Sequence, residues 1–133
     1  TRSMIFGIGT DLVEIERIAK VLARHGDRFT GYILTDGEGA EAKRRGDSVQ
    51  FIAGRWAAKE AVAKALGCGL GGRCAWRDIE VTGSASGAPV VTLSGDGART
   101  MKENGIARVF VSISHERGHA VAMAVAEKND IPS

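Results

Sequence analysis

Two carboxylates and a lysine stand at positions where they could bind a metal ion and a phosphate. Asp11 closes a short apolar segment, MIFGIGTD, and Glu60 and Lys64 lie one helical turn apart in RWAAKEAVAKALG. Proteins hold Mg²⁺ with one or two carboxylates, completed by substrate phosphates and water. A lysine one turn beyond Glu60 would reach the same phosphate as a point charge. The three residues therefore indicate phosphoryl-type transfer, in which a metal and a cation stabilise developing charge.

Each of these residues also has a structural interpretation. An aspartate before a helix is often an N-cap, and Glu60 and Lys64 form a favourable i, i+4 pair worth ~0.3–0.5 kcal/mol on a solvated face. Trp56 lies in line with them and indicates that this side is covered, while Arg55 and Lys59 flank it. The opposite arc of the helix predicts its buried face, which consists of Ala57, Ala58, Ala61, Val62 and Ala65.

A histidine and a glycine run invite functional interpretations as well. His115 ends the β-prone segment VSISH, either as a hydrogen-bonded structural residue or as a phosphate donor near Arg117. The segment GCGLGG at 67–72 fits G-x-G-x-x-G, but that motif binds a dinucleotide only after a strand and before a helix. Here it follows a helix, whose C-terminal end has partial negative charge. We interpret it as a C-cap and a loop.

A basic stripe marks the first predicted helix. Arg17, Lys20 and Arg24 fall on one side of it, and Arg28 would extend the stripe if the chain beyond Gly26 stayed in line. Such a stripe is either a solvated surface or a docking surface for an acidic helical partner, because charge complementarity speeds association and selects the partner.

The elements that would position these residues follow from hydrophobic periodicity. The first half of the chain predicts a strand at 4–11, a helix from Leu12 to Gly26, a short helix within loops at 30–47 and a long helix at 48–66. The second half predicts a hairpin of 78–82 and 89–93, a short helix at 97–104 and two strands at 108–115 and 119–127. The fold class is therefore α+β, with an antiparallel sheet packed with helices.

Composition narrows the class of protein. The chain has 133 residues and a mass of 14.0 kDa, with 44% hydrophobic and 26% charged residues, which is typical of one soluble globular domain. We place that domain at 4–128, with a polar tail at 129–133. Met4 is interpreted as the native start and residues 1–3 as an expression remnant.

Charge, hydropathy and cysteines argue against several partners. A net charge of +2 and a pI near 8.7 are too mild for nucleic-acid binding, yet they suit an acidic ligand or partner. The sequence has no apolar run of roughly 18 residues and no signal-peptide pattern, so no membrane association is expected. Cys68 and Cys74 are interpreted as reduced cysteines of a cytoplasmic protein, because two thiols make a poor zinc site.

Three blocks of the sequence together resemble one enzyme family. GIGTDLVEIERI, RWAAKEAVAKALG and SISHE, in this order and spacing, are similar to the signature blocks of holo-acyl-carrier-protein synthases, the small type of 4′-phosphopantetheinyl transferase. The likeness extends from about Met4 to Glu127 and includes DIEV and the Gly87–Pro89 segment.

The resemblance implies an activity and a set of site residues. Enzymes of this family move the phosphopantetheine arm of coenzyme A onto a serine of apo acyl carrier protein and release adenosine 3′,5′-bisphosphate. By resemblance, Asp11 and Glu60 hold Mg²⁺, and Glu60 and Lys64 are catalytic. The residues implied to bind coenzyme A are Arg45, Arg55, Lys64, Gly67, Gly69 and His115. Those implied to bind the acidic carrier protein are Arg17, Lys20, Arg24 and Arg28.

The family also implies an assembly. Its members are typically homotrimers with each active site between neighbouring protomers, which would explain the covered face bearing Trp56 and make it the wall of a metal–pyrophosphate site. The residue after His115 is Glu116, where some members have a hydroxyl residue. Two other functions remain open at this point. One is a non-catalytic binder of an acidic protein, and the other is a Mg²⁺-dependent enzyme acting on a different phosphate ester.

Overall fold

The structure is a computed structural model that describes residues 4–129. The predicted remnant at 1–3 and the tail beyond Asn129 lie outside the described residues. The strands are β1 (Met4–Glu14), β2 (Ile79–Gly83), β3 (Pro89–Leu93), β4 (Ile106–Glu116) and β5 (His119–Lys128). The helices are α1 (Ile15–His25), α2 (Asp27–Ile33), α3 (Asp36–Arg44), α4 (Val49–Ala65) and α5 (Gly95–Glu103), with a 3₁₀ turn, η1, at Trp76–Asp78.

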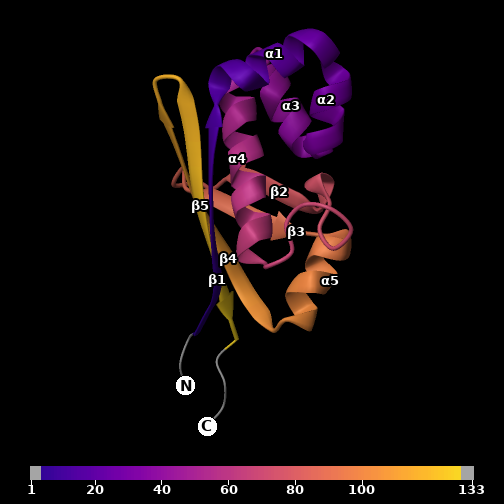
Figure 1. The fold of residues 1–133 in the computed structure, drawn as a ribbon, viewed down its shortest axis with the longest axis vertical. Coiled ribbons are helices and arrows are strands. Elements are labelled where there is room, and N and C mark those ends of the chain that lie inside the picture. The colour runs from indigo at the N-terminus through magenta and orange to yellow at the C-terminus, as the bar shows by residue number, and fades with distance from the viewer. Residues whose placement is uncertain (1–3, 130–133) are drawn as a thin grey trace.

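Three long strands form an antiparallel sheet in the order β1–β5–β4 (Figure 1). The central strand β5 pairs with β1 from Met4↔Lys128 to Glu14↔His119, and with β4 through a tight connection at Arg117–Gly118. The strands β2 and β3 form a separate hairpin. The predicted hairpin, the two C-terminal strands and the antiparallel α+β class are confirmed.

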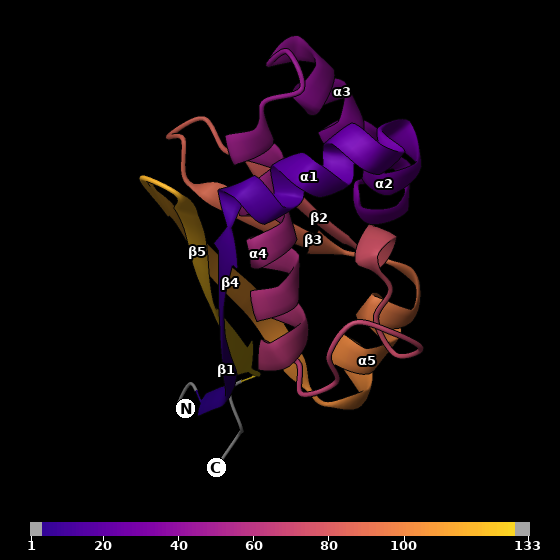
Figure 2. The same ribbon diagram turned by 45° about the horizontal axis from the view of Figure 1, so that its top comes forward.

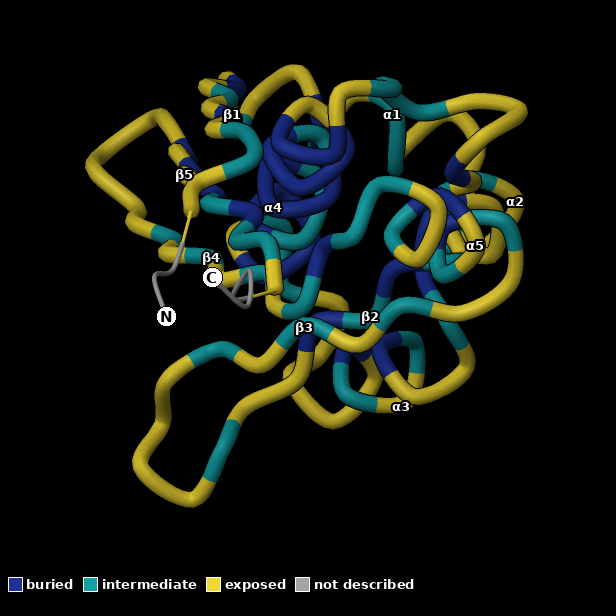
Figure 3. The backbone as a smooth tube through the Cα atoms, turned by 90° about the horizontal axis from the view of Figure 1, so that it is seen from below, coloured by how far each residue is buried: buried dark blue, intermediate teal, exposed yellow. Residues whose placement is uncertain are grey.

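The helix α4 packs along the inner face of the sheet and forms the centre of the core (Figures 1 and 3). Small side chains on both partners allow this close approach. Ala57, Ala58, Ala61, Val62 and Ala65 have no exposed surface, as predicted, and alternate residues of β5 from Ala120 to Ala126 are at most 1% exposed. A Cβ atom on Gly9 would overlap the Ala61 carbonyl oxygen. The strand β1 is therefore held directly against α4.

Two predictions about local structure were wrong. Leu12 does not begin a helix, because β1 continues to Glu14 with alternating burial and full pairing to β5. Asp11 is therefore inside a strand and is not an N-cap, a position that Glu14 occupies. The segment predicted to be mostly loop contains both α2 and α3. Thr35 and Glu38 form a capping box that starts α3, a signal that the surrounding glycines obscured.

The upper part of the molecule gathers α1, α2 and α3 around one end of α4 (Figure 2). Gly26 ends α1 with a positive φ of 51°, as predicted, and the chain turns into α2. Arg28 is consequently on a separate helix and does not extend the basic stripe in line.

Candidate active site

The close contact of β1 with α4 brings the predicted metal residues together. Lys64 Nζ donates to the Thr10 carbonyl oxygen at 2.9 Å and lies 3.5 Å from Asp11 Oδ1. Glu60, one turn before Lys64 on α4, is close enough to Asp11 for the two carboxylates to interact. The structure thus places Asp11, Glu60 and Lys64 in one group, which we call the carboxylate site.

The two carboxylates of the carboxylate site share one electrostatic property: the pKa of each is raised above its ordinary value. Partial burial raises the pKa of Asp11 above its ordinary value, against the attraction of Lys64 and Arg17. Burial also raises the pKa of Glu60, and the neighbouring Asp11 carboxylate raises it further. In both carboxyl groups burial has a larger effect than the attraction of Lys64 and Arg17.

The donor set of this site fits Mg²⁺. Asp11 Oδ2 is buried and is the one such side-chain atom within residues 4–129 that has no hydrogen-bond partner. No cluster of three or more His, Cys, Asp or Glu side chains in this part of the chain could hold a metal alone. Two carboxylates match a Mg²⁺ ion whose remaining ligands are substrate phosphates and water.

A second group of predicted residues lines a separate cleft of about 820 Å³. Arg45 comes from the end of α3, Arg55 from α4 and His115 from β4. The guanidinium carbon atoms of Arg45 and Arg55 lie 4.8 and 4.4 Å from the centroid of the Phe51 ring. Two cations over one aromatic ring form a concentrated positive surface, suited to a phosphate group.

His115 is an exposed residue of β4 that lines this cleft. Its Nε2 lies 2.9 Å from the Gln50 carbonyl oxygen, which can only accept, so Nε2–H is the donor. A Cβ atom on Gly54 would come within 2.8 Å of that nitrogen, so glycine leaves the space that the ring requires. Both structural and functional interpretations of His115 are therefore compatible with its geometry.

The cleft is not lined by the remaining residues predicted to bind coenzyme A. Lys64 belongs to the carboxylate site. Gly67 and Gly69 follow the end of α4 in the predicted loop, with positive φ angles of 82° and 66° that favour glycine. Their assignment to coenzyme A stays a prediction. Glu116 is exposed at the end of β4.

The predicted place of Lys59 beside a polar side of α4 was wrong, whereas the prediction that Trp56 is covered is confirmed. Lys59 does not flank a polar side: it is 0% exposed and forms an ion pair of 2.6 Å with Glu38, which is also buried. Trp56 is covered within its own chain, with ring centroids 5.7 Å from Phe29 and 4.5 Å from Trp76. It therefore needs no neighbouring protomer to cover it and forms no part of the carboxylate site.

The basic stripe on α1 is exposed and begins beside the carboxylate site. Arg17 is near enough to lower the pKa of both Asp11 and Glu60, opposing the effect of burial. Lys20 pairs with Glu16 at 3.7 Å, whereas Arg17 and Arg24 form no ion pair with the residues at 4–129. Periodicity predicted the stripe, but not its closeness to the carboxylates.

None of the helices described in residues 4–129 has the length and hydrophobicity needed to span a lipid bilayer.

Residues 7–124 match the 4′-phosphopantetheinyl transferase superfamily, and the chain belongs to this family. It is 45% identical over 128 residues to the holo-[acyl-carrier-protein] synthase of Methylobacterium radiotolerans, covering 93% of this chain and 94% of that protein.

Solved structures show the same fold. The holo-[acyl-carrier-protein] synthase of Neisseria meningitidis superposes with a TM-score of 0.89 at 41% identity, covering 94% of this chain and 100% of that one. The synthase of Helicobacter pylori, solved in complex with coenzyme A, gives a TM-score of 0.80 at 37% identity, covering 90% and 98%. The resemblance inferred from the three sequence blocks is confirmed.

Proposed function

We propose that this chain transfers the 4′-phosphopantetheine group of coenzyme A to a serine of apo acyl carrier protein, with adenosine 3′,5′-bisphosphate as the second product. The main support is the carboxylate site on β1 and α4, found in a member of the 4′-phosphopantetheinyl transferase superfamily beside an exposed basic stripe. Residues 4–128 act as one transferase domain in this proposal.

Asp11 and Glu60 would hold Mg²⁺, which when bound neutralises charge on the pyrophosphate oxygens. The serine oxygen attacks the phosphorus that bears the pantetheine. The new P–O bond forms as the bond to the bridging oxygen breaks, and the leaving bisphosphate takes that electron pair. Lys64, fixed by the Thr10 carbonyl, supplies positive charge near the reacting phosphate. Glu60 accepts the serine proton in this proposal.

The cleft would bind the other end of coenzyme A. Arg45 and Arg55 provide charge-assisted donors for its 3′-phosphate, and His115 lies beside them. The cleft lining does not include Asp11, Glu60 or Lys64. We therefore propose that one coenzyme A molecule contacts the cleft of one protomer and the carboxylate site of its neighbour in a homotrimer.

The outer face of the three-stranded sheet supports such an assembly. Its exposed large hydrophobic residues come from all three strands, and they are Ile8, Leu12, Phe110, Val121 and Met123, each at least 40% exposed. We call this the apolar sheet face. A contiguous exposed patch of this kind marks an interaction surface in soluble proteins.

Intact mass of a purified apo acyl carrier protein tests the reaction directly. After incubation with this protein, coenzyme A and Mg²⁺, we expect the mass to increase by one phosphopantetheine. We expect no increase when EDTA is present, because two protein carboxylates alone cannot replace the cation. An unmodified mass for several different apo carriers would contradict the function, and equal modification with EDTA would contradict the metal.

Charge reversal on the basic stripe should weaken carrier binding. For Arg17→Glu/Arg24→Glu we expect affinity for apo carrier protein to fall ~10-fold or more at low salt, with a smaller salt dependence, because complementary charges become repulsive. Affinity for adenosine 3′,5′-bisphosphate, which the separate cleft would bind, should change little. Calorimetric titrations at two salt concentrations measure both.

The matched control for that variant is Arg99→Glu/Lys102→Glu on α5, which changes the net charge equally at the other end of the molecule (Figure 1). We expect it to bind the carrier as the original protein does. Equal losses in the two variants would indicate a non-specific charge effect and remove the stripe as the docking surface.

A further inference from the structure

The Glu38–Lys59 ion pair is fully enclosed, although both groups are charged. Withdrawing two charges from water is unfavourable, and an apolar pair of similar volume is often as stable. What the pair contacts is therefore informative about its role.

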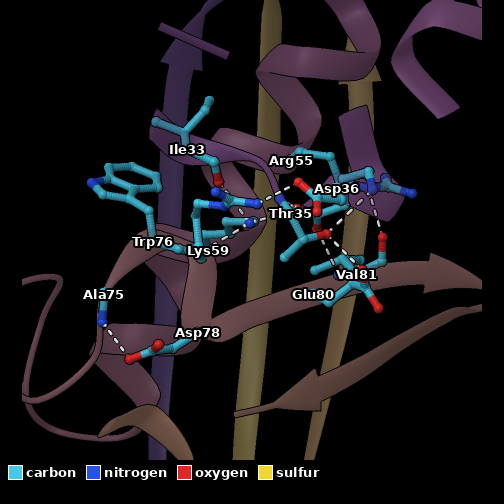
Figure 4. Close-up of polar contacts among 12 residues, drawn as sticks. Ile33, Thr35, Asp36, Arg55, Lys59, Ala75, Trp76, Asp78, Glu80 and Val81 are labelled. Carbon is cyan, nitrogen blue, oxygen red and sulfur yellow. Dashed lines mark hydrogen bonds and ion pairs between the residues drawn. The ribbon is translucent and has the colours of Figure 1, made fainter. Parts of the chain in front are cut away.

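Every polar atom of the pair is bonded. Lys59 Nζ donates to the Ile33 and Trp76 carbonyl oxygens at 2.7 and 3.0 Å (Figure 4). It also contacts Glu38 Oε1. Glu38 Oε1 also accepts from the Thr35 amide at 2.8 Å. Glu38 Oε2 accepts from the backbone amide of Val81 at 2.7 Å. One ion pair thus connects the end of α2, the start of α3, the middle of α4, η1 and β2.

Val81 connects the Glu38–Lys59 ion pair to the cleft. The same residue presents its carbonyl oxygen to Arg55 Nε at 3.0 Å, and Figure 4 shows Arg55 and Val81 beside this network. No hydrogen bond among residues 4–129 uses the terminal Nη atoms of Arg55. The guanidinium is therefore held by one hydrogen bond from Nε and by its contact with the Phe51 ring, and its outer nitrogens are available to a ligand.

The hydrogen bond from Arg55 Nε to the Val81 carbonyl oxygen opposes an electrostatic repulsion. Burial lowers the pKa of Arg55 below its ordinary value, the Glu38 carboxylate opposes this shift, and the nearby Arg45 guanidinium adds to it. Both guanidinium groups lie over Phe51 and repel each other. A displaced Val81 carbonyl would leave Arg55 free to move away from Arg45.

We propose that Glu38, neutralised by Lys59, is a positioning residue for Arg55: by fixing the Val81 backbone it directs the Arg55 guanidinium toward a phosphate bound in the cleft. The identity of that phosphate as part of coenzyme A rests on the proposed function. The geometric arrangement of Glu38, Val81 and Arg55 does not.

Two double variants separate positioning from folding, since neither leaves an unpaired buried charge. Glu38→Gln/Lys59→Met keeps an amide oxygen that can accept from Val81, whereas Glu38→Leu/Lys59→Met removes the acceptor. For the Leu variant we expect adenosine 3′,5′-bisphosphate to bind ~10-fold or more weakly, and for the Gln variant within ~3-fold of the original, as lost charge-assisted contacts imply. Calorimetry gives the affinities and thermal unfolding confirms the fold.

A second measurement does not depend on function. Exchange of the Arg55 Nε–H proton, followed by NMR, should be faster in the Leu variant and unchanged in the Gln variant. If the Leu variant does not fold, Glu38→Asp replaces it, because it keeps both charges but shortens the side chain away from Val81. A folded Leu or Asp variant with original affinity and a protected Nε–H would overturn the proposal.

Failure of the proposed function has a different signature. If the original protein binds the bisphosphate but never modifies an apo carrier, the function is wrong and the positioning role stands. If it modifies the carrier while the Leu variant binds the bisphosphate normally, only the positioning role is wrong.

Discussion

Asp11→Ala should lower the turnover of apo carrier protein by ~10²–10³-fold, the usual loss when one group that stabilises transition-state charge is removed. Asp11 provides one of the two carboxylates of the site, and its Oδ2 has no other partner within residues 4–129. The measurement is the rate of mass gain of the carrier at saturating coenzyme A. A variant that retains near-original turnover would remove Asp11 from the metal site.

Stability provides the control for this variant. The raised pKa of Asp11 means that its ionised form is less favourable in the folded chain than in the unfolded one. Ionised Asp11 therefore lowers the free energy of unfolding at neutral pH. This destabilising effect disappears as the pH falls through the pKa of Asp11 in the folded chain. The contact with Lys64, which is 50% exposed, adds little stability. We expect the free energy of unfolding to change by less than about 1 kcal/mol. MgCl₂ should raise the melting temperature of the original protein but not of Asp11→Ala.

Mixing two inactive variants should restore activity if sites are shared between protomers. Asp11→Ala removes the carboxylate site and Arg55→Ala removes the cleft. In trimers formed from an equal mixture, each site takes its cleft from one chain and its carboxylates from the adjacent chain. Each half is intact with a probability of one half, so roughly one quarter of the sites should be active. Each variant refolded alone from urea, and the two refolded together, provide the comparison.

The apolar sheet face supplies the control for mixing. Phe110→Glu places a charge on that face and should give a monomer that shows no recovery in the mixture. Val90→Glu is the matched substitution, since Val90 is 44% exposed on the separate hairpin, and it should stay trimeric. Light scattering measures the assembly. Full activity in monomeric Phe110→Glu, or no recovery in the mixed trimers, would contradict a shared site.

Periodicity was sufficient for most of the fold. The apolar, β-prone segments of β4 and β5 predicted both strands correctly, and the alanine-rich arc of α4 predicted its buried face correctly. Periodicity did not predict the features that depend on pairing between segments distant in the sequence. Leu12 and Val13 extend β1 because β5 offers partners up to His119, and a local pattern contains no trace of that neighbour.

The carboxylate site was predictable in part because Glu60 and Lys64 share one helix. Their grouping with Asp11 was inferred from the ligand chemistry of the residue types and was supported by the family resemblance, whereas the closeness of Arg17 came only from the structure. Lys59 was misplaced because a lysine is ordinarily exposed. Its burial depends on Glu38, which belongs to a segment that the sequence did not resolve into helices. A buried charge requires a partner, and no spacing rule identifies a partner on another element.

The central position of β5 has a consequence for how the chain acquires its structure. Neither β1 nor β4 can join the sheet until β5, the last element described, is available to both. During synthesis, β1 and its glycines that face α4 cannot pair until β5 (His119–Lys128) has been made. Such non-local pairing slows folding and leaves apolar strand edges open to misassociation. Pulsed hydrogen exchange during refolding should find the amides of β1 protected only together with those of β5.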